Sequence, residues 1–175
     1  ELAYFNTIMA QIEIAEPKDL EDIKAELQAE GYLKAKKTGA KKQKRYKISE
    51  PEVFYASDGT RIFVGKNNYQ NDQLTLKKAH KTDIWLHVKN IPGSHVIIDS
   101  PDPSEDTLQE AGNLAAYFSK ARLSAAVPVD YIQVKKIKKP NGARPGFVIY
   151  EGQQTLYTTP DEQLVQKLRN KPVQD

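Results

Sequence analysis

Apolar residues recur at helical spacing at the start of the chain. Within residues 1–14 they lie three or four positions apart, at Leu2, Phe5, Met9 and Ile12. A second helix is predicted from Pro17 to Gly31, since proline suits a first helical turn and glycine a helix end; its apolar stripe is Leu20, Ile23 and Leu27. The pattern fits the base of a helical hairpin or coiled coil, or equally a helical pair packed on its own domain.

The middle of the chain alternates apolar and polar residues with the period of a β-strand. Residues 53–56 and 61–64 predict a hairpin, because Asp58-Gly59 supplies the positive φ angles of a tight turn. Residues 83–88 predict a strand with one apolar face and one mixed face. The apolar face carries Ile84, Leu86 and Val88, and the mixed face carries Asp83, Trp85 and His87. A Pro-Gly turn and a second apolar run, residues 95–98, follow.

The remaining patterns complete an α+β prediction. A weakly amphipathic helix is expected over 69–79, and a long helix over 102–122 with Asp102 as N-cap and Pro103 next. Strands are expected over 129–137, 147–150 and 155–158, and a last helix from Thr159 through Leu168. Strands outnumber helices without βαβ alternation, so we expect a mixed, largely antiparallel sheet. The long helix packs on one face, and an N-terminal helical segment precedes the sheet.

Composition adds a constraint on compartment and on partners. The chain has 175 residues and no cysteine, which excludes disulfides and thiolate chemistry and fits a cytosolic protein. No run is long and apolar enough for a membrane span, so no membrane is expected. The sequence begins at Glu1 within an apparent helix, which suggests a fragment of a longer protein.

Basic charge is concentrated between residues 34 and 47. This segment holds 8 of the 26 lysines and arginines and no acid, so the rest of the chain is net acidic. It is interpreted as a solvated basic linker, or as a phosphate-contacting segment. The residues proposed for phosphate contact are Lys41, Lys42, Lys44 and Arg45.

Catalytic and metal sites are the poorer interpretation. His80, His87, His95 and Asp83 could be drawn as metal ligands, but Asp83 and His87 would lie roughly 13 Å apart along a strand. Ser94-His95 with Asp99 is the nearest nucleophile set, yet no nucleophile elbow surrounds Ser94. Phosphate-binding glycine motifs are absent. No enzyme activity, metal or cofactor is therefore expected.

A binding surface is the stronger interpretation of residues 83–95. An indole can stack on a base, and a histidine can donate a hydrogen bond to a phosphate or a ribose hydroxyl. Gly93 and Ser94 could offer donors to an anion. The structural alternative remains open, in which Trp85 belongs to the core and His87 is a buried, hydrogen-bonded histidine.

Two blocks resemble the signature of the NFACT-R domain of the RqcH/NEMF family, some of whose bacterial members are labelled fibronectin-binding proteins. They are residues 83–89, Asp-Ile-Trp-Leu-His-Val-Lys, and residues 92–96, Pro-Gly-Ser-His-Val. Residues 65–68 and 145–150 also resemble family blocks. The resemblance implies RNA-binding positions at Asp83, Trp85, His87, Lys89, Gly93, Ser94 and His95.

The resemblance also implies a domain plan and a cellular role. Residues 1–33 would end a coiled-coil middle region, 34–47 would be the basic linker, and 48–172 the NFACT-R domain. The family binds stalled large ribosomal subunits, with tRNA and ribosomal RNA as partners, for alanine tailing of nascent chains in the cytoplasm. This domain would bind RNA and not elongate chains. The alternative function is a surface adhesin that binds fibronectin.

Overall fold

A single antiparallel sheet organises the structure. The computed structural model describes residues 1–34 and 47–173. Its 6-stranded sheet has the order β1-β2-β4-β3-β5-β6, and all neighbouring strands pair antiparallel. The strands are β1 Glu52–Tyr55, β2 Arg61–Val64, β3 Ile84–Val88, β4 Val96–Ile98, β5 Val127–Gln133 and β6 Gln154–Thr158. The predicted α+β class is confirmed.

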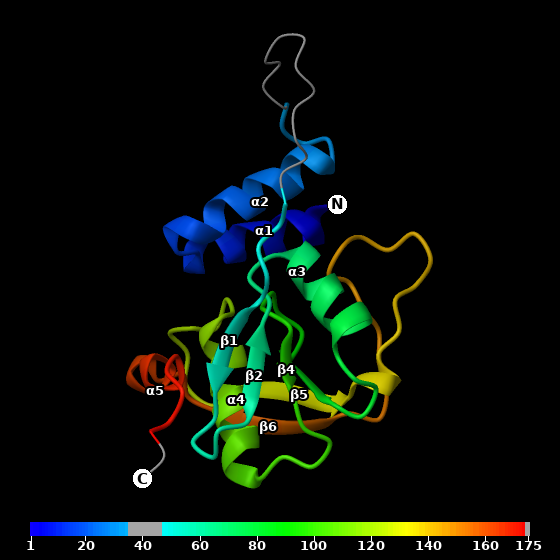
Figure 1. Ribbon diagram of the computed structural model, residues 1–175. Helices are drawn as coiled ribbons and strands as arrows, with labels where there is room; N and C mark the ends of the chain where they lie inside the picture. The colour runs from blue at the N-terminus through cyan, green and yellow to red at the C-terminus, as the bar shows by residue number, and fades with distance from the viewer. Residues whose placement is uncertain (35–46, 174–175) are drawn as a thin grey trace.

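Helices cover both faces and one end of this sheet (Figure 1). The α1–α2 pair lies across one end, α3 lies beside β4, and α4 packs on the opposite face. The helices are α1 Leu2–Ile14, α2 Pro17–Ala29, α3 Asn68–Gln73, α4 Glu105–Tyr117 and α5 Glu162–Leu168, with a π-helical turn η1 Leu74–Lys78 and a 3-10 turn η2 Val134–Lys136. Among the described residues no helix has the length and apolarity to cross a bilayer.

Both faces of the central strand β3 are buried. As predicted, Leu86 and Val88 point into the main core, which Leu114 of α4 and Phe118, just after α4, help to complete. The opposite face forms a second apolar cluster around Trp85, in which η1, η2 and Ile137 after it cover residues of the neighbouring strands β4 and β5. Its members are Leu74, Trp85, Ile97, Ile132, Val134 and Ile137.

The predicted apolar seam of the first helix is not its buried face. Leu2, Phe5, Met9 and Ile12 are all exposed. The helix instead buries Tyr4, Ile8, Ala10 and Gln11. In α2, Ile23 is buried as expected, but Leu20 is exposed. The helices form a hairpin docked on the sheet domain, and polar partners on α2 and α3 decide which side of α1 faces inward.

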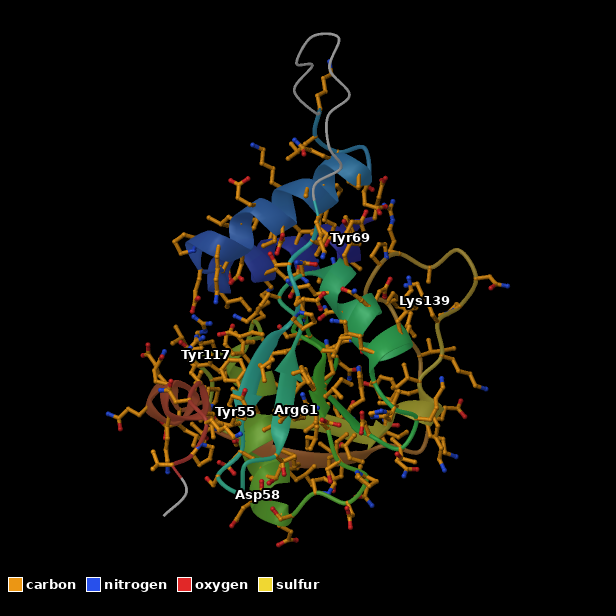
Figure 2. All side chains as sticks on the ribbon, viewed as in Figure 1. Tyr55, Asp58, Arg61, Tyr69, Tyr117 and Lys139 are labelled. Carbon is orange, nitrogen blue, oxygen red and sulfur yellow. The ribbon has the colours of Figure 1, made fainter. Side chains whose placement is uncertain are left out.

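Glu26 of α2 is the centre of this docking. Its carboxylate is fully buried and accepts hydrogen bonds from the Tyr4 hydroxyl and from the backbone and side-chain N–H of Asn68 (3.0 Å each for Asn68). Gln11 Nε2 donates to Asn68 Oδ1 at 2.9 Å. Tyr69 lies where α3 meets the hairpin, and its hydroxyl donates to Glu30 (Figure 2). One carboxylate thus connects α1, α2 and α3.

Several predicted element ends move in the structure. α4 begins after Ser104, whose hydroxyl accepts from the Thr107 N–H, and not after Asp102. It ends at Tyr117 and not near residue 122, because Phe118 leaves the helical conformation with φ −90° and ψ 49°, and its carbonyl accepts from the N–H of Ser94. The last helix is capped by Asp161 and not by Thr159.

The predicted strands after α4 are also shortened. β5 begins at Val127 and ends at Gln133, where η2 follows, so residues 134–137 do not continue the strand. Residues 147–150 form no strand and make only an isolated bridge between Lys138 and Ile149. The residues between them form a loop that runs along the side of α3 (Figure 1).

Replacing Glu26 by alanine should destabilise the chain by about 2–4 kcal/mol, because the donors of Tyr4 and Asn68 would stay buried without an acceptor. The free energy of unfolding from urea titration measures this. Glu21→Ala on the exposed face of α2 is the matched control and should change stability by less than about 0.5 kcal/mol. Equal effects for the two variants would contradict the assigned role of Glu26.

Candidate functional site: a cleft beside the hairpin

Trp85 is a core residue. Its side chain is 1% exposed and packs between the second cluster and the Tyr150 ring, whose centroid lies 4.8 Å away. The sequence left burial and stacking on a ligand as alternatives, and the structure places the indole inside. Its Nε1–H has no hydrogen-bond partner among the described residues. The exposed indole platform of the sequence hypothesis is therefore not present.

His87 lies parallel to Trp85 and is partly buried at the bottom of a cleft. The two rings stack with centroids 5.6 Å apart and an interplanar angle of 6°. Nδ1 lies 2.6 Å from the Val88 carbonyl and Nε2 3.2 Å from the Gly93 carbonyl. Burial lowers the pKa of His87, so the ring is neutral near pH 7. A neutral imidazole has one N–H and can donate to only one of these carbonyls.

His95 is buried and holds the loop before β6 against the sheet. Its Nε2 donates to the Gly146 carbonyl at 3.0 Å, and its Nδ1 accepts from the Thr75 hydroxyl at 2.8 Å. These partners define the Nε2–H tautomer. Burial, aided by the neighbouring His87, lowers the pKa of His95 to about 3. Both nitrogens are occupied, so His95 forms no relay with Ser94 and Asp99.

Lys89 and Asp83 are both engaged inside the domain. The Lys89 ammonium lies 2.9 Å from a carboxylate oxygen of Asp130, which also accepts from the hydroxyls of Tyr150 and Thr155. Asp83 is buried and accepts from the backbone N–H of His80 at 2.9 Å. Both predicted site residues are thus held by contacts within the domain, and Asp83 lies at the end of β3 away from the cleft.

The four residues that the sequence analysis considered and rejected as metal ligands are divided between two places. His87 and His95 lie at the cleft, whereas His80 and Asp83 lie at the other end of β3. There, His80, Asp83 and Asp99 bring one ligand atom each within 4.8 Å of one another. The Asp99 carboxylate already accepts from the Arg61 guanidinium at 2.7 Å. These contacts account for the carboxylates without an ion.

Gly93 and Ser94 form the turn that closes one wall of the cleft. Both are buried, and Ser94 donates its backbone N–H to the Phe118 carbonyl. A Cβ at Gly93 would lie 2.7 Å from the Val88 side chain and 3.0 Å from that of Ser119. Only glycine fits this close approach. The Gly93 carbonyl faces His87, and the neighbouring Asn90 has a positive φ of 57°.

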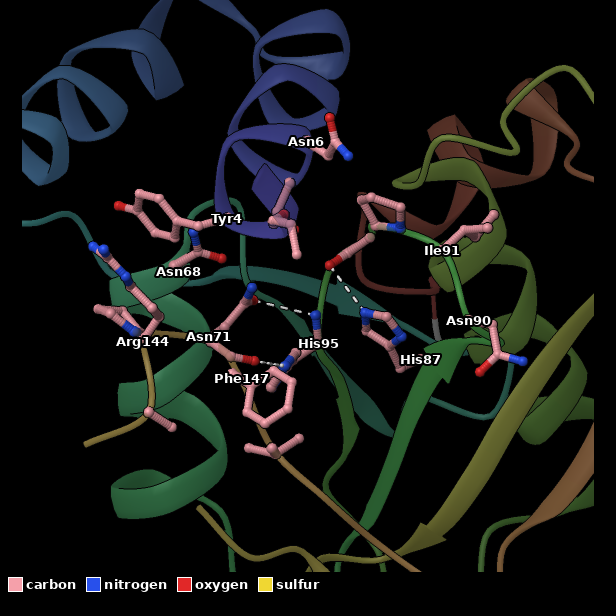
Figure 3. Close-up of a pocket in the computed structure, with 18 of the residues that line it drawn as sticks. Tyr4, Asn6, Asn68, Asn71, His87, Asn90, Ile91, His95, Arg144 and Phe147 are labelled. Atoms are coloured by element: carbon pink, nitrogen blue, oxygen red, sulfur yellow. Dashed lines mark hydrogen bonds between the residues drawn. The ribbon is translucent and has the colours of Figure 1, made fainter. Parts of the chain in front are cut away.

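The cleft itself lies between α1, the turn 90–95 and the loop 142–150 (Figure 3). Its volume is about 730 Å³. The floor is formed by His87 and His95, whose rings meet edge to face with centroids 5.7 Å apart. The walls carry amide side chains and apolar groups, namely Asn6, Asn68, Asn71, Asn90, Ile91, Pro92 and Phe147.

Loop 142–147 supplies the wall that no single motif predicted. Phe147 is 55% exposed at the rim. The Arg144 guanidinium lies 5.1 Å from the Tyr4 ring centroid, within cation–π range. Gly146 has φ +83°, and a Cβ there would lie 2.6 Å from Asn68 Oδ1. The two flanking blocks at 65–68 and 145–150 were the sequence signal for this wall, since both meet at the cleft.

The predicted phosphate contacts of the basic linker cannot be placed against the cleft. Lys41, Lys42, Lys44 and Arg45 lie outside the described residues. Their role stays a prediction, as do the domain boundaries at 33 and 47. Of the predicted site residues, the structure brings His87, Gly93 and His95 together at the cleft, with the buried Trp85 also part of its lining, while Ser94 does not line it.

Comparisons with known proteins agree on one family. Residues 51–157 match the family described as NFACT protein RNA binding domain, and residues 1–46 match NFACT N-terminal and middle domains. The chain belongs to the NFACT family. The resemblance seen in residues 83–96 is therefore confirmed.

Similar proteins are longer than this NFACT chain. A Bacillus subtilis protein called Rqc2 homolog RqcH is 48% identical over 171 residues, which is 97% of this chain and 30% of that protein. A Streptococcus suis protein of the same name is 48% identical over 166 residues, or 94% of this chain and 29% of its own length. The chain thus spans about a third of these relatives.

A solved structure shares the fold. It is described as the C-terminal part of the fibronectin/fibrinogen-binding protein from Streptococcus suis. It superposes with a TM-score of 0.90 at 46% identity, covering 95% of this chain and 66% of that one. The docked helical hairpin is included in this coverage.

His95 should stay neutral well below the ordinary histidine range. Between about pH 6.5 and 3 the unfolded chain binds a proton that the folded NFACT domain does not, so stability should fall as pH falls, by up to about 1.4 kcal/mol per pH unit. Nitrogen-15 NMR of the imidazole should show the Nε2–H tautomer down to about pH 5. A His95 titration midpoint near 6.5 would contradict this assignment.

Proposed function

We propose that this chain is an RNA-binding module, and that an unstacked base of single-stranded RNA enters the cleft between α1 and loop 142–147. The observation that carries the proposal is the composition of the cleft. It combines an aromatic rim at Phe147, an imidazole floor at His87 and amide groups such as Asn71. These groups can stack on a base and hydrogen-bond to its edges.

Size and charge support a base as the ligand. A cleft of about 730 Å³ falls within the range of about 300–1,000 Å³ that holds small organic ligands. A base can stack against Phe147, while the Asn6 and Asn90 amides lie at exposed positions on the walls. Both histidines are neutral, so the floor presents hydrogen-bonding groups and not a charge. Phosphate charges are expected to be met outside the cleft.

The family supports the wider role. A domain described as RNA-binding, in relatives called Rqc2 homolog RqcH, fits a ribosome-associated quality control factor of the cytoplasm. We propose tRNA and ribosomal RNA of stalled large subunits as its partners, and alanine tailing as the activity of the longer protein. This module would contribute binding and no catalysis.

Fibronectin binding is the competing function, because the solved relative's description names fibronectin and fibrinogen. The salt dependence of binding distinguishes RNA binding from fibronectin binding. RNA binding should weaken steeply as salt rises, since phosphate contacts release counterions. Binding to fibronectin with no binding to tRNA or ribosomal RNA would favour the adhesin.

Phe147→Ala should weaken binding of single-stranded RNA about tenfold, because base–aromatic stacking contributes about 1–3 kcal/mol per base. Fluorescence anisotropy with a labelled oligonucleotide measures the Kd. Trp85→Ala is unsuitable as a test, since the buried indole holds the second core cluster.

Tyr157→Ala is the matched control. Tyr157 is 67% exposed on the edge strand β6 and does not line the cleft. Its removal should leave the Kd unchanged. Equal losses for both variants would argue against a base in the cleft.

A further inference from the structure

A group of exposed lysines lies outside both the cleft and the basic linker. We call it the lysine ridge, and its members are Lys77, Lys81, Lys135, Lys136 and Lys138. None of them forms an ion pair among residues 1–34 and 47–173. Their neighbours Lys78 and Lys139 do form pairs, with Glu50 and Asp72.

The fold brings together segments that are more than 50 residues apart. The N–H of Lys135 donates to the Lys81 carbonyl at 3.0 Å, and that of Val134 donates to the Asp83 carbonyl at 2.9 Å. η1 carries Lys77 and ends at Lys78, and the loop after it leads directly to Lys81. The ridge is therefore built on the end of η1, the turn before β3, the turn η2 and Lys138 shortly after it.

The ridge has a rigid base. Leu74 of η1 and Val134 of η2 are both buried in the second apolar cluster, and Ile137 joins them. The lysine backbones are thereby fixed, while their side chains extend into solvent. A fixed array of this kind loses less conformational freedom on binding than the same charges on a free segment.

Nearby carboxylates do not neutralise the ridge. Asp99 is paired with Arg61 at 2.7 Å, and Asp72 with Lys139 at 3.3 Å. The buried Asp83 carboxylate lies 3.3 Å from His80 Nδ1 and within ion-pair distance of no ridge lysine. Among the described residues, the ridge ammonium groups are therefore without a carboxylate partner.

We propose that the lysine ridge contacts the phosphate backbone of RNA, as a second surface separate from the cleft. The proposal rests on the RNA-binding function proposed above. The connection between the ridge and the cleft favours RNA over an acidic protein as the partner of the ridge. The loop that starts at Lys138 continues to residues 142–147, which form the wall of the cleft. A strand with one base in the cleft can follow this loop to the ridge.

The chemistry of the ridge is that of a sequence-independent contact. Lysine binds phosphate as a point charge and reads no base edge. The apolar side chain exposed on η1 is Leu76, at 38%, which offers little surface for a protein or membrane partner. The ridge would therefore add affinity and salt dependence, while the cleft would select an unpaired base.

The test is the salt dependence of RNA binding by a triple variant, Lys81→Gln, Lys135→Gln and Lys136→Gln. Each lost contact to single-stranded RNA should lower the slope of log K against log salt by about 0.7, so the slope should fall by about 2. Affinity should drop most at low salt and converge with the unaltered chain at high salt.

The control carries the same charge change elsewhere, as Lys24→Gln, Lys167→Gln and Lys171→Gln. These lysines are exposed and lie on α2, α5 and the segment after α5. The control should keep the slope and the Kd of the unaltered chain. All variants should keep its urea midpoint, because none of the altered side chains is buried.

Any other outcome would overturn the ridge proposal, alone or together with the proposed function. An unchanged slope in the ridge variant, with Phe147→Ala still weakening binding, would overturn the ridge and leave the proposed function intact. Equal losses in ridge and control variants would show a general charge effect and overturn it too. If the ridge variant lost binding to polyglutamate, a probe for acidic proteins, but kept its binding to RNA, the ridge would be assigned to an acidic protein partner. No RNA binding by the unaltered chain would overturn both proposals.

Discussion

Burying the Glu26 carboxylate determines how the two parts of this molecule meet. A carboxylate with no exposed surface has lost its hydration and must recover hydrogen bonds from the protein. Burial raises the pKa of Glu26, while the Tyr4 and Asn68 donors act in the opposite direction. Because these donors come from α1 and α3, the hairpin can satisfy Glu26 only in one position on the domain. Docking is thereby made specific as well as stable.

A second polar contact fixes the other end of the hairpin. Lys66 is almost fully buried, lies 3.0 Å from Glu52 and 3.8 Å from Asp19, and faces the Phe118 ring at 3.9 Å. Arg169, beyond α5, pairs with Glu16 at 2.9 Å. The cleft depends on this geometry, since α1 forms one wall and the domain the others. A hairpin that detached would remove the cleft without altering the sheet.

The features that the sequence predicted correctly depend on the spacing of residues close together along the chain. Alternation at residues 84–88, the hairpin around Asp58-Gly59 and the α+β class are observed, although only Gly59 of the turn pair has a positive φ. The burial of Trp85 could not be predicted from local spacing, because the side chains that bury it belong to residues 74, 132 and 137. The prediction that the apolar seam of α1 is its buried face was wrong for a related reason. Tyr4 and Gln11 turn inward to partners that no periodicity can reveal.

Residues of the motif at 83–95 support the cleft from within the domain, and their contact with RNA stays a prediction. The buried members of the motif build the cleft: Trp85 supports His87, and His95 holds the Gly146 carbonyl while Asp72 holds the Gly146 N–H at 2.8 Å. The same Asp72 pairs with Lys139 near the start of that loop. The loop is thus fixed at two points between the ridge and the cleft. A ligand bound at either surface meets a wall already in place, which lowers the entropy lost on binding.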